Sequence, residues 1–197
     1  MPIPILQRAI DLDAELFEAH FFCGLGCRDT GDFPSAAVHY ERAAELQSRN
    51  HQPLAMLADV LMAMGRREQS ESAARRCLDR IEEAFGRNPE VAEVLGMGAT
   101  VLVNLRENER ADRWVRRAIL LDPESYSVFY NAACTYAVIG KPDLAQKWLE
   151  HAFSQMPRAR GWLLSNAKHD AQLNALRGRP DFQQLMKRLE AHVAATS

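Results

Sequence analysis

Three side chains that can bind a metal fall on one face of a helix expected near the N-terminus. His20, Cys23 and Cys27 are spaced i, i+3 and i+7, so they point the same way from a helix. An imidazole and two thiols are ligands that zinc and copper accept. No fourth ligand is evident nearby, and the same spacing suits an apolar stripe in which cysteine acts as a small hydrophobic residue. We therefore expect these residues in the core and predict no metal and no cofactor.

Two other pairs have the residue types of a nucleophile and its base, namely Cys134 with His151 and His169 with Asp170. Nothing in their spacing orients one group on the other. The sequence also lacks a glycine-rich phosphate loop and a nucleophile elbow. We predict that the chain is not an enzyme, and that His169 and Asp170 cap or hydrogen-bond an irregular segment.

Four arginines have the spacing of one helical stripe in the segment that leads to Pro123: Arg106, Arg110, Arg113 and Arg117. Such a row can hold an acidic peptide or a phosphate. Glu107, Glu109 and Asp112 are interleaved with it, which is typical of a solvated outer face. The sequence favours the second interpretation.

Composition and charge argue against several classes of protein. The chain has 197 residues, of which 47% are hydrophobic and 25% charged, as expected for one domain with a substantial core. A net charge of −2 argues against a nucleic-acid-binding surface. No apolar run reaches the roughly 18 residues that cross a membrane, and the N-terminus lacks the features of a signal peptide. The four cysteines show no disulfide spacing, so we expect a cytoplasmic protein.

The stretch from Tyr126 to Pro157 predicts the elements that organise the chain. It reads as two helices joined by a turn at residues 139–142 and ended by Pro157. Large residues alternate with small ones at helical spacing, which lets two helices pack closely. These positions are Phe129, Ala132, Ala133 and Tyr136 on the first helix, and Ala145, Leu149 and Ala152 on the second.

The same pattern recurs along the chain with a period near 34. Gly31 and Gly65 in the expected turns differ by 65−31=34, and Ala118 and Ala152 differ by 152−118=34. The step from Gly65 to Arg106 is 41, seven longer, and we expect the surplus to lengthen the second helix of repeat two. In repeat three, Arg106 stands in place of the turn glycine, and the first helix is apolar on nearly every side, which predicts burial.

This large–small code with a 34-residue period resembles the tetratricopeptide repeat (TPR). The resemblance implies an all-α solenoid, a right-handed superhelix of antiparallel helix pairs, with a C-terminal capping helix. It places an array at 1–159, made of a half-repeat at 3–16 and repeats at 17–50, 51–91, 92–125 and 126–159. A capping segment at 160–197 belongs to the same domain, and its last helix is expected from about Pro180 to Val193.

The resemblance also implies a binding site, because TPR proteins bind partners in a concave groove lined by the first helix of each repeat. The residues expected there are Phe21, Leu25, Arg28, Ala55, Asp59, Met62, Tyr130, Asn131 and Cys134. These are not the lysine–asparagine carboxylate clamp of the family's chaperone-tail binders. An apolar groove with Met62 suits an amphipathic helix or an extended apolar peptide of a protein partner. Alternatively, the chain's own C-terminal helix or a second copy fills it.

The two ends of the chain suggest its context. Residues 3–16 look like the second helix of a repeat without its first, which is expected either in a fragment of a longer protein or in a homodimer covering that end. The segment 169–189 resembles a tail of TPR regions in bacterial adenylate cyclase-like proteins and transcriptional regulators, in Asp170, Leu173, Leu176, Arg177, Pro180, Phe182 and Leu185. We therefore expect a protein–protein interaction scaffold from a larger bacterial signalling protein. The alternatives are an intramolecular regulatory module and a structural self-association module.

Overall fold

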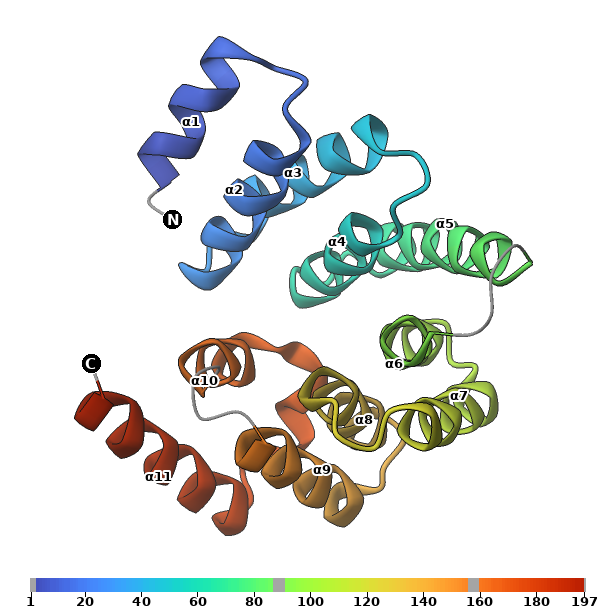
Figure 1. The fold of residues 1–197 in the computed structure, drawn as a ribbon, viewed down its shortest axis with the longest axis vertical. Helices are drawn as coiled ribbons and strands as arrows, with labels where there is room; N and C mark the ends of the chain where they lie inside the picture. The colour runs from blue at the N-terminus through green and yellow to red at the C-terminus, as the bar shows by residue number, and fades with distance from the viewer. Residues whose placement is uncertain (1–2, 87–90, 156–159, 197) are drawn as a thin grey trace. The chain divides into compact units, whose positions relative to one another are not determined.

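The structure is a computed structural model that describes residues 3–86, 91–155 and 160–196, and every regular element within these ranges is helical. Figure 1 shows the helices in chain order. They group into two compact units, residues 1–88 and 89–197, which we call the N-terminal and C-terminal units. The N-terminal unit contains α1 (Ile3–Leu12), α2 (Phe17–Asp29), α3 (Phe33–Leu46), α4 (Gln52–Ala63) and α5 (Arg67–Phe85).

The C-terminal unit contains the remaining helices. These are α6 (Ala92–Asn104), α7 (Asn108–Leu121), α8 (Tyr126–Val138), α9 (Pro142–Gln155), α10 (Arg160–His169), the 3-10 helix η2 (Ala171–Leu176) and α11 (Pro180–Thr196). In neither unit is a described helix both long and apolar enough for a membrane span. The predicted division into one array at 1–159 and a cap at 160–197 stays a prediction.

Four helix hairpins, α2–α3, α4–α5, α6–α7 and α8–α9, share one turn geometry. The residues at the turn, Gly31, Gly65, Arg106 and Gly140, all have positive φ. In each turn the next N–H bonds the carbonyl five residues back, as from Asp32 to Cys27 at 2.8 Å and from Glu107 to Leu102 at 3.0 Å. This is the Schellman ending of a helix. It confirms that Arg106 takes the place of the turn glycine.

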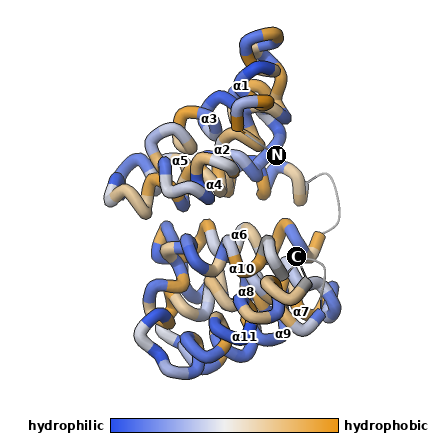
Figure 2. Tube along the Cα trace, turned by 90° about the vertical axis from the view of Figure 1, so that its left-hand side faces the viewer, coloured by the Kyte–Doolittle hydropathy of each residue, from blue (hydrophilic) through white to orange (hydrophobic). Residues whose placement is uncertain are grey.

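The hairpins are held together by the predicted small and large residues. Ala36, Tyr40 and Ala43 are fully buried. So are the corresponding residues of the other second helices, namely Ser70, Ala74 and Cys77 on α5 and Ala145, Leu149 and Ala152 on α9. The hydropathy of α3 and α5 alternates along the chain, which Figure 2 shows as orange and blue stretches. Such amphipathic helices bury one face and leave the other to solvent.

Two expectations about individual helices are confirmed. The second helix of repeat two is long, because α5 has 19 residues where α3, α7 and α9 have 14 each. The first helix of repeat three is buried along most of its length. The last helix begins at Pro180 as expected and runs three residues further than predicted, to Thr196. It packs against α9 and α10.

Candidate peptide-binding site

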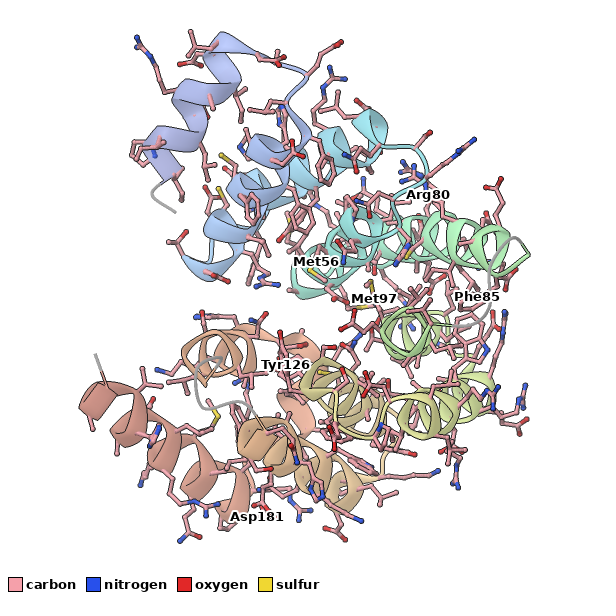
Figure 3. The ribbon with its side chains drawn as sticks, in the orientation of Figure 1. Met56, Arg80, Phe85, Met97, Tyr126 and Asp181 are labelled. Carbon is pink, nitrogen blue, oxygen red and sulfur yellow. The ribbon has the colours of Figure 1, made fainter. Side chains whose placement is uncertain are left out.

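The six predicted groove residues of the N-terminal unit lie on two neighbouring helices. Phe21, Leu25 and Arg28 follow one stripe of α2, and Ala55, Asp59 and Met62 follow the matching stripe of α4. Ala55 is buried, and the other five are half-buried. Arg28 joins the helices, because its Nη1 donates to the sulfur of Met56 on α4 at 3.5 Å (Met56 is labelled in Figure 3). This face combines apolar surface with one basic and one acidic side chain.

Phe21 is held in place by other rings. Its ring stacks on Phe17 at a centroid distance of 5.6 Å and lies 6.0 Å from that of Tyr40. Tyr40 approaches α2 so closely that a Cβ on Gly24 would lie 2.6 Å from its ring. Burial raises the pKa of the Tyr40 hydroxyl well above its usual range. Phe21 is therefore a fixed aromatic anchor on this face.

The three predicted groove residues of the C-terminal unit are Tyr130, Asn131 and Cys134 on α8, and two of them contact the chain's own tail. The Tyr130 hydroxyl donates to Oδ2 of Asp170 at 3.0 Å, and the Cys134 thiol donates to the same oxygen at 3.3 Å. Tyr130 and Cys134 are buried, and Asn131 is half-buried. The Asp170 carboxylate thus occupies the face of α8 that was expected to meet a partner.

The segment that follows Asp170 also contacts α6. Nε2 of Gln172 donates to the Thr100 carbonyl at 3.0 Å and to Oδ1 of Asn104 at 3.2 Å. Leu173 and Leu176 are fully buried, and η2 packs against α8. The segment 170–176 therefore covers the faces of α6 and α8 that carry Thr100 and Tyr130, whereas the last helix, α11, packs on α9 and α10. That the C-terminal helix or a second copy fills the predicted groove stays a prediction.

His20, Cys23 and Cys27 lie in the core of the N-terminal unit, as expected. Nε2 of His20 lies 3.2 Å from the Ala14 carbonyl and its Nδ1 lies 3.3 Å from Nδ1 of His39. A carbonyl only accepts, so Nε2 carries the proton and His39 donates to Nδ1. Cys23 and Cys27 are buried, and burial raises the pKa of both thiols. Among the described residues no group of three or more His, Cys, Asp and Glu could hold a metal ion.

The remaining candidate sets are not brought together. Cys134 bonds Asp170, whereas Nδ1 of His151 lies 3.0 Å from the Lys147 carbonyl of its own helix. In the arginine row, Arg110 pairs with Glu107 at 3.2 Å and lies 4.9 Å from the Trp114 ring centroid. Arg106, Arg113 and Arg117 are exposed, as expected for an outer face.

Residues 54–90 match the family model of the tetratricopeptide repeat. No curated protein sequence matches the chain. The solved structure of PilW, a widely conserved type IV pilus biogenesis factor, has a TM-score of 0.52 at 14% identity, covering 94% of this chain and 82% of PilW.

Two further solved structures are similar at lower scores. Pseudomonas aeruginosa PilF has a TM-score of 0.48 at 23% identity, over 89% of this chain and 75% of PilF. YrrB, described as a TPR protein with an unusual peptide-binding site, has a TM-score of 0.47 at 16% identity, over 95% of this chain and 91% of YrrB. The repeat match, the four hairpins and the likeness to PilW agree, and the chain is an all-α protein with the tetratricopeptide repeat fold.

Proposed function

We propose that this chain is a protein-interaction module that binds a peptide or helix of a protein partner on the concave face of its N-terminal unit. The binding residues in this proposal are Phe21, Leu25, Arg28, Asp59 and Met62. Binding rather than catalysis is the proposed activity, because the residues on this face offer contact surface and charge but no oriented nucleophile and base.

The observation that carries the proposal is the difference between the two units. In the C-terminal unit, Asp170 and Gln172 already hold the matching faces of α8 and α6. Among residues 3–86 no segment donates or accepts in this way over the stripe of Phe21, Leu25 and Met62, whose side chains keep part of their surface exposed. The N-terminal unit therefore keeps a face that a partner can use.

The composition of this face sets the ligand class. Phe21 is a fixed ring, and Leu25 and Met62 are aliphatic, so they favour an apolar side chain. Arg28 and Asp59 add opposite charges and favour polar groups beside it. An amphipathic helix satisfies both requirements. The partner is a separate protein or another part of a larger bacterial signalling protein, as the tail pattern at 169–189 suggests.

Peptides selected from a random displayed library against the whole protein test this proposal. Their affinities are then measured for wild type, Leu25→Glu, Met62→Glu and the control Leu120→Glu, which places the same charge on an exposed leucine of α7. We expect the two groove variants to weaken binding about tenfold or more and the control to leave it unchanged. Equal binding by all four folded proteins would exclude this face as the site.

A further inference from the structure

A second groove lies on the other side of the N-terminal unit, between the second helices α3 and α5. Its volume is about 720 Å³, and its floor includes Leu57 and Leu61 of α4. Ala37 and Val38 of α3 line one wall and Ala73 of α5 lines the other, with Arg66 at the start of α5. We call it the outer groove. None of the concave-face residues lines it.

The C-terminal unit contains the same pair of hairpins, displaced by 75 residues. The turn residues Gly31 and Arg106 differ by 106−31=75, and Gly65 and Gly140 differ by 140−65=75, and all four have positive φ. In this register Ala37 corresponds to Asp112, Arg66 to Lys141 and Ala73 to Trp148. The C-terminal unit thus shows which residues stand at the same three positions in a second pair of hairpins.

In the C-terminal unit the cation and the apolar wall both have partners. Nζ of Lys141 pairs with Oδ1 of Asp112 at 2.9 Å. The Trp148 ring stacks on Phe129 of α8, with ring centroids 5.2 Å apart and an interplanar angle of 24°. A carboxylate and an indole therefore complete this surface from within the chain.

The N-terminal unit has neither the carboxylate nor the aromatic ring at the corresponding positions. Ala37 supplies no carboxylate, and Ala73 supplies no ring. The other charged residues of the outer groove are paired, with Glu41 to Arg76 at 2.8 Å and Arg42 to Glu45 at 3.0 Å. The exposed Arg66 guanidinium has no ion-pair or hydrogen-bond partner in the described part of the chain. Val38 adds an apolar side chain that is 69% exposed.

We propose that the outer groove binds a helical segment of a partner protein, which supplies the missing groups: an acidic side chain for Arg66 and a bulky apolar side chain over Ala73. Arg66 and Ala73 lie seven residues apart, about 10 Å or two helical turns along α5. A helix that carries Glu at position i and Trp at i+7 matches this separation. The site is distinct from the concave face and does not depend on its function.

The test uses the whole protein and a fluorescein-labelled, alanine-based helical peptide with Glu at i, Leu at i+3 and i+4, and Trp at i+7. A second peptide has Lys in place of Glu. Anisotropy titrations compare wild type with Ala37→Asp, which supplies the internal carboxylate, and with Arg66→Glu, which reverses an exposed charge. Arg75→Glu is the matched control, because Arg75 is an exposed arginine of α5 outside the groove.

We expect wild type and Arg75→Glu to prefer the Glu peptide, and Ala37→Asp and Arg66→Glu to bind it about fivefold to tenfold more weakly. Arg66→Glu should bind the Lys peptide more tightly than wild type does. Circular dichroism confirms that each variant is folded.

Three results would overturn the proposal. One is equal affinity of all four proteins for the Glu peptide, or no binding by any. Another is loss of Glu-peptide binding in Met62→Glu, which would place the peptide on the concave face. The third is a wild-type dimer in sedimentation that Ala37→Asp converts to a monomer, because a second copy would then occupy the groove.

Discussion

Arg106 adopts a backbone conformation that L-residues rarely take. Its φ is 62°, whereas the other three turns have glycine with φ of 82°, 72° and 78°. A Cβ in the left-handed region meets the following carbonyl, which costs roughly 1–2 kcal/mol for residues other than glycine. The turn of repeat three therefore contains a strained residue, whereas the other three turns have glycine at this position.

Replacing Arg106 with Gly should stabilise the protein by about 0.5–1 kcal/mol, since relief of the strain exceeds the added entropy of the unfolded chain. Urea denaturation followed by circular dichroism measures the change. Gly140→Ala is the reverse control, because nothing lies within 4 Å of an added Cβ and only the backbone term acts. It should destabilise by about 1 kcal/mol. A change of stability with the same sign in both variants would contradict the strain argument.

His39 makes the N-terminal unit sensitive to pH. Burial lowers its pKa below the usual 6.5, and the neighbouring His20 lowers it further, while Asp32 acts in the opposite direction. Burial also lowers the pKa of His51. A histidine with a lowered pKa in the folded state binds its proton more readily when unfolded, so stability falls as the pH drops below about 6.5.

We therefore expect the free energy of unfolding to rise between pH 5 and pH 7, by an amount that His39→Gln reduces. Glutamine can still donate to His20, so the variant removes the titration and keeps a donor. The residual slope belongs to His51. Asp32 and Asp112 also have lowered pKa values, but their contribution is lost only as the pH falls below about 4. A slope unchanged in His39→Gln would assign the pH dependence to other groups.

At the scale of elements, one side chain of α5 caps the neighbouring helix. Arg80 lies in the second-to-last turn of α5, and its guanidinium reaches the end of α3 (Arg80 is labelled in Figure 3). It donates to the carbonyls of Asn50 at 2.7 Å, Ala44 at 3.1 Å and Gln47 at 3.4 Å. A helix leaves its last carbonyls unpaired and carries a partial negative charge there. Arg80 of α5 thus caps the end of α3.

Arg80→Gln should destabilise the protein by about 1.5–3 kcal/mol, because bonds between a charged donor and partly buried carbonyls are lost. Arg80→Lys should recover less than half, since an ammonium cannot reproduce the planar fork. Arg75→Gln, at an exposed position of the same helix, should change stability by less than about 0.5 kcal/mol. Thermal or urea unfolding separates the three variants, and a loss in Arg80→Gln as small as in Arg75→Gln would refute the capping role.

Features that recur in each repeat could be predicted from the sequence, whereas contacts that occur only once in the chain could not. The period of 34, the step of 41 and the large–small code correctly predicted the turn at Arg106, the long α5 and the buried Tyr40 and Leu149. The bond from Gln172 to Thr100 spans 172−100=72 residues and has no counterpart in other repeats, so no pattern reveals it. Asp170 was named in the sequence as a possible cap beside His169 and within the tail segment, but its bonds to Tyr130 and Cys134 were not predicted. Whether the nine predicted groove residues bind a partner stays a prediction.

At the scale of the molecule, the segment after the last hairpin contributes buried residues to the hydrophobic core of the C-terminal unit. Leu163, Leu173 and Leu176 are fully buried, and they come from α10 and η2, which follow the last hairpin. Arg179 adds a link from the tail to α9, since its guanidinium pairs with Asp143 at 2.7 Å and with Asp181, labelled in Figure 3, at 2.8 Å. The tail therefore acts as a structural cap for the hairpins α6–α7 and α8–α9.

A fragment of residues 89–197 should therefore fold alone, with helical circular dichroism and a cooperative thermal transition. Removing the tail, in a fragment of residues 89–159, should abolish that transition. Tyr130 and Cys134 then lose Asp170, and α8 loses the apolar surface of Leu173 and Leu176, worth about 1.5–3 kcal/mol for each leucine. Full-length protein with Leu173→Ala and Leu176→Ala provides an intermediate case. If residues 89–197 remain unfolded while the full chain melts cooperatively, the core of this unit depends on residues 1–88, and the tail alone does not complete it.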